Sequence, residues 1–357
     1  MKVMFFLPSL QSGGAERVVS VLANNMSKNG IDVSIVTICN DKCCYEISKE
    51  VSLHCLDCDK DISLPTFKRM SKRINKIRDI IRLSSPDVAI AFMANTGIDV
   101  SLAARGTKVP VIVSERNDPK LDPPSRFRRE LRKFAYNFVK GFVFQTAEAQ
   151  AFFPERIRNR STVIFNPLSP NLPQVTTGEK DKKIVAVGRL NKQKNYPMLF
   201  AAYERIAKKH PDYELEIYGE GVLEEQLKAE AAKIDAKVNF MGFCSDVHEK
   251  IKDAALYIMS SDFEGMPNAL MEAMAIGLPC ISTDCPCGGP KMLIENGVNG
   301  ILVPVGDDKA LEEAIDWCLS NTEKAEQMGY KASKIRERLS IDGITKQWLR
   351  FIEERIS

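Results

Sequence analysis

Long apolar runs are absent from this chain of 357 residues. No stretch approaches the roughly 18 consecutive apolar residues of a membrane-spanning helix. The opening segment MKVMFFLPSL is too short for a signal peptide and lacks a small-residue cleavage site, so we expect a cytoplasmic protein. Histidine occurs only three times and the ten cysteines do not form a regular set of C-x-x-C pairs, so we expect reduced thiols and no metal site.

The G-x-G-x-x-G fingerprint of dinucleotide-binding domains is also absent. In its place, SGGAER puts Gly13 and Gly14 between the first predicted strand and the first predicted helix. Glycines at such a turn let a substrate approach the backbone closely. Both residues are therefore candidate binding residues.

The composition, with 44% apolar and 27% charged residues, is typical of a folded protein. Because one hydrophobic core rarely serves a chain of this length, we expect two domains. Strand-like and helical runs alternate in two successive series, which predicts an α/β fold of two doubly wound, Rossmann-like domains. The turn-rich segment LSPNLPQVTTGEKDKK divides residues 1–170 from 171–339, and a last helix over about 340–357 is expected to pack back on the first domain. We expect a cleft with one substrate held by each domain.

Positive charge is concentrated in the first half of the chain. Residues 1–170 contain 26 lysines and arginines against 17 acids, a net charge of +9, whereas the remainder contains 24 against 30, or −6. Residues 67–83 have the spacing of an amphipathic helix with a basic face. Candidate contacts with an anionic membrane are Lys68, Arg69, Lys72, Arg73, Arg128 and Arg129. The alternative is an ordinary surface helix whose charges are solvated.

The strongest chemical signal is the segment SSDFEGMPNALMEAMAIGLPC, in which Glu264 and Glu272 are eight residues apart. Gly265 and Pro267 shape a loop, and a helix is predicted to begin near Asn268 because helix formers follow it. The free amides at that helix start could hold a diphosphate. Glu272 could accept both hydroxyls of a ribose, with Glu264 facing the sugar. Alternatively, Glu272 only complements the helix dipole.

A second pair of candidates follows the first predicted strand of the second domain. In VGRLNKQKN, Arg189 and Lys194 are five residues apart at the strand's carboxyl end. Two cations at such a position can neutralise a diphosphate, although solvated loop charges would produce the same pattern. Further candidates at predicted strand ends are Gly219 in YGEG and Phe243 after VNFMG.

Taken together, these motifs resemble the retaining GT-B enzymes of glycosyltransferase family four. The GGAE loop, GRL with Lys194, the YGEG turn, the Glu-x7-Glu segment and ENGVNGILVP carry the resemblance almost from end to end. The forms SERNDP, EGMPNALMEAMA and DCPCGGPKMLIENGVNG are similar to bacterial N-acetylhexosaminyltransferases that build lipid-linked oligosaccharides and capsule repeats.

The resemblance implies a role for each motif residue. Arg189 and Lys194 would bind the donor diphosphate, Glu272 the ribose and Glu264 the transferred sugar. The remaining donor contacts that it implies are Gly265, Met266, Asn268 and, for the base, Phe243. It also implies a UDP-sugar donor, a saccharide on polyprenyl diphosphate as acceptor, peripheral association with the inner face of the plasma membrane, and neither a cofactor nor a nucleic-acid partner.

One position departs from the family pattern. Relatives commonly carry a histidine near the donor sugar after the strand that reads VPVIVSER here, whereas this chain has Arg116. The three histidines are His54, His210 and His248. None follows a predicted strand beside another motif, so we expect all three to be ordinary surface or partly buried residues.

No well-placed protein nucleophile is evident, so the expected mechanism is attack from the face that the diphosphate leaves. Catalysis would come from positioning and from charge stabilisation by Arg189, Lys194 and the helix start. Two alternatives stay open. One is a GT-B-fold sugar epimerase or phosphorylase, and the other is a non-catalytic subunit that binds a nucleotide sugar.

Overall fold

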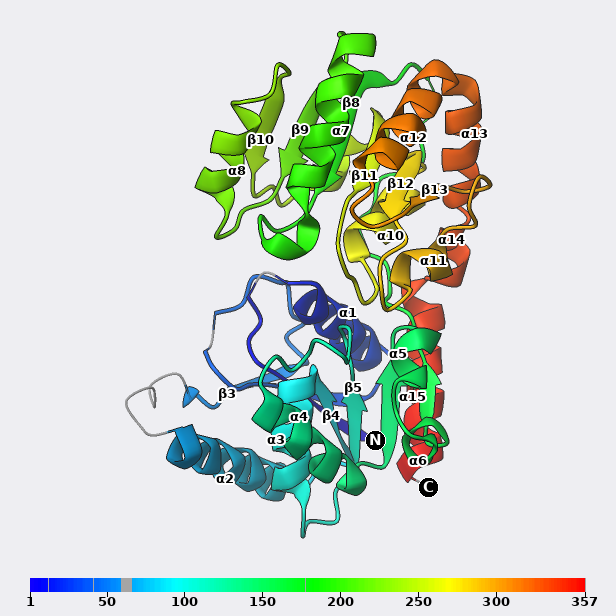
Figure 1. Ribbon diagram of the computed structural model, residues 1–357. Helices are drawn as coiled ribbons and strands as arrows, with labels where there is room; N and C mark the ends of the chain where they lie inside the picture. Colours follow the sequence, from blue (N-terminus) through cyan, green and yellow to red (C-terminus); the bar gives the residue numbers. More distant parts are fainter. Residues whose placement is uncertain (12, 41, 59–65, 177, 357) are drawn as a thin grey trace. The chain divides into compact units, whose positions relative to one another are not determined.

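The computed structural model describes residues 1–11, 13–40, 42–58, 66–176 and 178–356. The chain divides into two compact units (Figure 1). Unit 1 consists of Met1–Pro167 together with the segment from Ser340 onward, and unit 2 is Leu168–Leu339. Each unit is built on one parallel sheet flanked by helices, which confirms the predicted α/β class with two doubly wound sheets.

The sheet of unit 1 is built from β1 (Lys2–Leu7), β2 (Asp32–Thr37), β3 (Ser52–Cys55), β4 (Val88–Phe92), β5 (Val111–Ser114), β6 (Gly141–Phe144) and β7 (Ser161–Val163). Its strand order is β3-β2-β1-β4-β5-β6-β7. Strands β4, β5 and β6 are apolar and buried along their whole length, as expected for parallel strands covered on both faces. The order changes direction between β1 and β4, where such sheets bind ligands.

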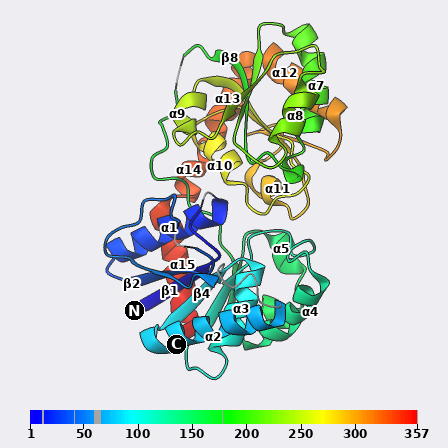
Figure 2. The same ribbon diagram turned by 90° about the vertical axis from the view of Figure 1, so that its left-hand side faces the viewer.

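The helices of unit 1 are α1 (Gly14–Lys28), α2 (Thr66–Ser84), α3 (Ala94–Ala104), α4 (Arg126–Ala135), the 3-10 turn η2 (Tyr136–Phe138), α5 (Ala147–Ala151), α6 (Glu155–Arg158) and α15 (Ile341–Ile356). Helix α3 packs between α2 and α4, and α1 packs against α15 (Figure 2). Trp348 of α15 is fully buried and stacks on Phe92 at the end of β4, with ring centroids 5.6 Å apart. The C-terminal helix therefore contributes to the core of unit 1.

The sheet of unit 2 is built from β8 (Asp181–Val187), β9 (Glu214–Tyr218), β10 (Val238–Gly242), β11 (Ala254–Met259), β12 (Cys280–Thr283) and β13 (Ile301–Val303), in the order β10-β9-β8-β11-β12-β13. Its helices are η3 (Lys192–Lys194), α7 (Tyr196–Lys209), α8 (Glu224–Ala231), α9 (Val247–Ile251), α10 (Asn268–Ala275), α11 (Gly289–Leu293), α12 (Asp308–Ser320), α13 (Thr322–Ala332) and α14 (Ile335–Arg338). One apolar cluster joins α7, α8, α12 and α13 to the sheet. This core holds the strand ends that carry the candidate donor residues.

Among the described residues, no helix combines the length and apolar character needed to cross a bilayer.

Candidate active site

The carboxyl ends of β8 and β11 define the candidate site of unit 2. The strand order changes direction between these neighbours, so the loops that follow them diverge and leave room for a ligand. The loop after β8 carries Arg189 and Lys194, and the loop after β11 carries Glu264. The side chain of Asn191 accepts a hydrogen bond from the backbone amide of Lys194 at 3.3 Å. The hydroxyl of Ser260 donates to the Lys194 carbonyl at 2.8 Å. These bonds fix the backbone of Lys194 between the two strand ends.

Lys194 and Glu264 form an ion pair in which Nζ lies 2.6 Å from Oε1, and their side chains are only 17% and 10% exposed. Ser261 donates its hydroxyl to the same carboxylate oxygen at 2.9 Å. The stem of Lys194 packs over Gly188, where an added Cβ would lie 2.8 Å from Lys194 Cε. Two of the predicted catalytic residues are thus brought together as a positioned cation and a positioned acceptor.

The YGEG turn after β9 packs directly on the segment that carries Arg189. A Cβ at Gly219 would lie 2.1 Å from the carbonyl oxygen of Gly188, and a Cβ at Gly221 would lie 2.3 Å from that of Leu190. Gly219 therefore allows the close backbone packing that fixes the loop after β8. Arg189 itself is exposed at the surface.

Phe243 lies on the loop after β10, and its ring is largely exposed. Its backbone amide donates to Glu220 Oε1 at 3.4 Å, which ties this loop to the YGEG turn. An exposed aromatic ring at a strand end can stack on a nucleotide base. The geometry is compatible with the role that the resemblance implies for Phe243.

Helix α10 begins directly after the loop that follows β11. Its N-cap is Pro267, which provides no side-chain acceptor for the first amides of the helix. Gly265 and Met266 are buried, and Asn268 is half-buried. The loop packs directly against Gly289, where an added Cβ would lie 1.7 Å from the carbonyl oxygen of Gly265. The predicted cradle of backbone amides is therefore built on a tightly packed loop.

Glu272 is buried on α10 and contacts His248 of α9. His248 Nε2 lies 2.9 Å from Glu272 Oε2, and because a carboxylate accepts hydrogen bonds, the imidazole N–H donates. His248 is partly buried, as expected, and its contact with Glu272 is one that the sequence did not reveal. His210 instead pairs with Asp316 at 2.7 Å on the helical side of unit 2, and His54 is exposed on β3.

Gly13 and Gly14 lie in unit 1, at the start of α1. Gly13 is the N-cap, and its amide donates to the hydroxyl of Tyr45 at 2.7 Å. The same hydroxyl donates to the Gly13 carbonyl at 2.6 Å. Tyr45 therefore braces the glycine turn, a contact that the sequence did not reveal.

Arg116 follows β5 in unit 1. Its guanidinium lies over the ring of Phe92, 4.8 Å from the centroid, and donates to Ser114 Oγ at 3.3 Å. It also donates to Asn166 Oδ1. Burial lowers the pKa of Arg116 to about 9. The departure from the family pattern thus puts a positioned cation at the carboxyl edge of the sheet in unit 1.

Two of the predicted membrane contacts, Arg73 and Arg128, form ion pairs inside unit 1. Arg73 Nε lies 2.7 Å from Asp99 Oδ2, and Arg128 Nη1 lies 2.8 Å from Asp99 Oδ1. Asp99 is buried on α3, so these arginines link α2 and α4 to the helix between them. Arg73 and Arg128 are therefore held by a buried carboxylate, and their predicted contact with a membrane stays a prediction.

In the part of the chain that the structure describes, no group of three or more histidine, cysteine, aspartate or glutamate side chains could hold a metal ion.

Two Rossmann-like sheets in one chain, with a paired cation and two buried carboxylates in the second unit, match the architecture of GT-B glycosyltransferases. Residues 13–168 match the glycosyl transferase 4-like domain, and residues 170–335 match the glycosyl transferases group 1 family. The two matches follow each other along almost the entire chain. The chain therefore consists of a glycosyl transferase 4-like domain followed by a glycosyl transferases group 1 domain, and it belongs to the glycosyltransferases, as the sequence motifs predicted.

Two similar proteins come from Campylobacter jejuni. One is the GalNAc-alpha-(1->4)-GalNAc-alpha-(1->3)-diNAcBac-PP-undecaprenol alpha-1,4-N-acetyl-D-galactosaminyltransferase, 28% identical over 361 residues and 99% of each chain. The other is the N-acetylgalactosamine-N,N'-diacetylbacillosaminyl-diphospho-undecaprenol 4-alpha-N-acetylgalactosaminyltransferase, 28% identical over 342 residues and 90% of each chain. Among solved structures, Anabaena HepE in complex with UDP has a TM-score of 0.80 at 18% identity, covering 99% of this chain and 100% of that one. The structural likeness supports the GT-B fold.

Proposed function

We propose that this chain transfers a hexose or N-acetylhexosamine from a UDP-sugar to a saccharide on polyprenyl diphosphate, with retention of anomeric configuration, in the assembly of a cell-surface polysaccharide or glycan. The observation that carries the proposal is the Lys194–Glu264 pair beside the start of α10, with Glu272 inside that helix. The names of the two Campylobacter relatives, which specify undecaprenol-linked acceptors, support the acceptor class. The UDP complex of HepE supports the donor class.

In this proposal the donor lies along the carboxyl edge of unit 2. Lys194 and Arg189 neutralise the charge that develops on the departing diphosphate. The backbone N–H groups of Gly265, Met266 and Asn268 donate to the phosphate oxygens at the positive end of α10. Glu272 accepts the ribose hydroxyls, and Glu264 orients the transferred sugar.

Retention follows if the acceptor hydroxyl attacks from the face that the diphosphate leaves. A phosphate oxygen of the leaving group then helps to accept the hydroxyl proton while the new glycosidic bond forms. Lys194 and Arg189 supply positive charge that a divalent metal supplies in many other enzymes. The proposed reaction therefore needs neither a metal nor a cofactor beyond the UDP-sugar substrate.

The acceptor's polyprenyl tail lies in a bilayer, so we propose peripheral association with the cytoplasmic face of the plasma membrane. The excess positive charge of residues 1–170 favours contact between unit 1 and anionic lipid. In this proposal Lys68, Arg69, Lys72 and Arg129 contact the lipid, whereas Arg73 and Arg128 also form ion pairs with Asp99.

A product assay tests the proposed function. The purified chain is incubated with UDP-glucose, UDP-galactose, UDP-GlcNAc or UDP-GalNAc, with and without a short-chain polyprenyl diphosphate saccharide. We expect UDP release that depends on the acceptor, and NMR should show an α-linked product from the α-linked donor. An inverted product would contradict retention. Epimerised donor or phosphorolysis without transfer would favour the same-fold alternatives, and binding without turnover would favour a non-catalytic subunit.

A further inference from the structure

Helix α4 buries an arginine and exposes two phenylalanines. Arg132 is buried and donates to the carbonyl oxygens of Asp122 at 2.7 Å and Pro119 at 2.9 Å. On the same helix, Phe127 and Phe134 are 60% and 48% exposed. A surface helix normally turns its apolar side to the core and its charges to water. Large parts of both phenylalanine rings therefore lie outside the packed core of unit 1.

The exposed phenylalanines lie along one side of the helix. Phe127 and Phe134 are seven residues apart, which is close to two helical turns and puts them on the same side. Phe138, on η2, follows four residues later and is 36% exposed. Its ring meets that of Phe134 edge-on, with centroids 5.2 Å apart. We call Phe127, Phe134 and Phe138 the aromatic row.

Basic side chains accompany the aromatic row. The guanidinium of Arg105 lies over the ring of Phe138, 4.9 Å from its centroid. Glu130 is the only acid in the sequence from 126 to 140, and it pairs with Lys133 at 2.8 Å. The exposed basic residues of this region are Arg105, Arg126, Lys133 and Lys140. The row is therefore an apolar strip within a positively charged surface.

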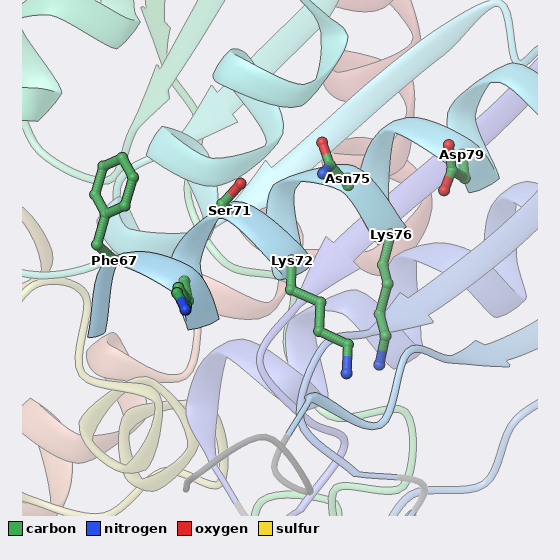
Figure 3. Close-up of a pocket in the computed structure, with 7 residues that line it drawn as sticks. Phe67, Ser71, Lys72, Asn75, Lys76 and Asp79 are labelled. Atoms are coloured by element: carbon green, nitrogen blue, oxygen red, sulfur yellow. The ribbon is translucent and has the colours of Figure 1, made fainter. Parts of the chain in front are cut away.

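Helix α2 offers a different arrangement. Its apolar residues Ile77 and Ile81 are completely buried, so its apolar stripe packs inside unit 1. Figure 3 shows Lys72 and Lys76 extending to one side of α2, while Phe67 extends to the other. Lys76 also donates to a backbone carbonyl at 2.7 Å. The labelled lysines of α2 thus do not share a side with its exposed phenylalanine.

We propose that the aromatic row inserts into the headgroup region of an anionic bilayer, with the neighbouring arginines and lysines on lipid phosphates. This inference rests on the proposed function, because an acceptor anchored by a polyprenyl tail requires the enzyme at the bilayer surface. Aromatic side chains flanked by basic ones match the boundary between acyl chains and anionic headgroups. The same positive rim opposes the stacking of two copies of this surface on each other.

Vesicle flotation tests this surface. Wild type is compared with Phe127→Ser/Phe134→Ser on phosphatidylcholine vesicles with and without phosphatidylglycerol. The matched control, Leu83→Ser/Tyr330→Ser, removes two exposed apolar side chains outside the row. We expect the phenylalanine variant to lose about tenfold or more of its binding to anionic vesicles, because it lacks the two rings that would insert into the bilayer, and the control to bind like wild type. Equal flotation of the phenylalanine variant and wild type would overturn the proposal.

The substitution Phe134→Trp reports insertion directly. Wild type supplies the baseline for the two native residues, Trp317 and Trp348. With anionic vesicles, the emission of the variant should shift to the blue and be quenched by lipids brominated on their acyl chains. Absence of quenching in protein that floats would overturn the proposal. A spectral shift that depends on protein concentration without vesicles would overturn it too, since a second copy would then cover the row.

Activity separates a failure of this surface from a failure of the proposed function. On a water-soluble acceptor analogue, Phe127→Ser/Phe134→Ser should keep turnover within about twofold of wild type, whereas on a vesicle-borne acceptor it should lose about tenfold. Unchanged activity on both acceptors would contradict the role of the row. If wild type itself is inactive on both, the proposed function fails while flotation and quenching still test the surface. Circular dichroism verifies that the variant is folded.

Discussion

Single residues decide what the donor site can do, and Lys194 is the first to test. Lys194→Ala removes a positioned charge from the proposed leaving group and leaves the carboxylate of Glu264 buried without its cation. We expect kcat to fall by roughly a hundredfold or more, and Arg189→Ala to have a similar effect, because both charges act on the departing diphosphate. Steady-state kinetics at saturating UDP-sugar measure this.

Lys192→Ala provides a matched control, because Lys192 is an exposed cation on the same 3-10 turn as Lys194. It should retain nearly full activity. If Lys194→Ala and Arg189→Ala each lost less than about threefold, the diphosphate assignment would be untenable, since removing one such charge costs far more.

His248 tests a positioning role. Its N–H donates to one oxygen of Glu272 and so orients the carboxylate that we assign to the ribose. His248→Ala should raise the KM for UDP-sugar by about five- to tenfold with a smaller change in kcat, because the lost hydrogen bond affects binding more than chemistry. His248→Gln, which keeps an N–H donor, should recover most of the affinity. Equal KM values for wild type and both variants would exclude this role.

A chelator tests the metal-free mechanism. With Lys194 and Arg189 as the proposed charges on the diphosphate, EDTA should leave the rate unchanged within experimental error. Loss of activity with EDTA and its restoration by manganese would show that the diphosphate is held by a metal instead.

Most of the candidate donor residues could be found from the sequence, and His248 could not. Arg189 follows the apolar run IVAV of β8, Glu264 follows the apolar strand β11, and Glu272 lies in a run of helix formers, so the sequence indicated their positions. His248 lies on α9, a helix of only five residues with no apolar periodicity. Its contact with Glu272 depends on how the helices before and after β11 meet, which sequence spacing does not specify.

Among the structural elements, the loop before α10 is the most sensitive to small changes. A Cβ at Gly289 would lie 1.7 Å from the carbonyl oxygen of Gly265, and backbone cannot yield as a flexible side chain can. Gly289→Ala should therefore destabilise unit 2 by about 3 kcal/mol and weaken UDP-sugar binding. Urea unfolding and calorimetric titration with UDP measure the two effects.

Gly297→Ala is a control that distinguishes the steric clash at Gly289 from the backbone strain of replacing a glycine with positive φ. Gly297 has φ of +77° and open space around its Cβ position. We expect a cost of about 1 kcal/mol there, from backbone strain alone. If Gly289→Ala were no more destabilising than Gly297→Ala, the loop would be looser than the packing indicates.

Helices and strands could be predicted from the sequence where burial requires a regular pattern of apolar residues. The run VAIAF of β4 is buried throughout, and the helix predicted over 67–83 is α2, Thr66–Ser84. Strand β3 was missed because all four of its residues are exposed, so no apolar alternation marks it. The exposure of Phe127 on α4 could not be predicted from the sequence either. Periodicity shows that a helix has two different sides, but it does not show which side faces the core.

At the scale of the whole molecule, stability should depend on pH through a buried carboxyl group in unit 1. Glu115 lies at the end of β5, where the hydroxyl of Tyr136 donates to its Oε1 at 2.5 Å and Arg132 Nη1 is 3.7 Å from the same oxygen. Burial raises the pKa of Glu115 to about 7, outweighing the attraction of Arg132. The folded protein therefore holds a proton on Glu115 at pH values where the unfolded chain has lost it.

The sign of the pH dependence follows from that difference. The contribution of Glu115 to folding is complete below the unfolded pKa of about 4.5 and is lost as the pH rises through about 7. The free energy of unfolding should thus fall by as much as roughly 3 kcal/mol across this window on account of this group. Glu115→Gln keeps an acceptor for Tyr136 without a titrating carboxyl, so it should flatten this part of the profile.

Trp348 provides the readout for this prediction, since it is fully buried in unit 1 whereas Trp317 is partly exposed in unit 2. In a Trp317→Phe background, fluorescence-monitored urea unfolding between about pH 5 and pH 8 isolates unit 1 across the titration window. Wild type should lose stability over this range while Glu115→Gln changes much less. If the stability of both proteins changed with pH in the same way, the prediction would be wrong. Glu115 would then be ionised in the folded state, with Arg132 offsetting the cost of burying the carboxylate charge.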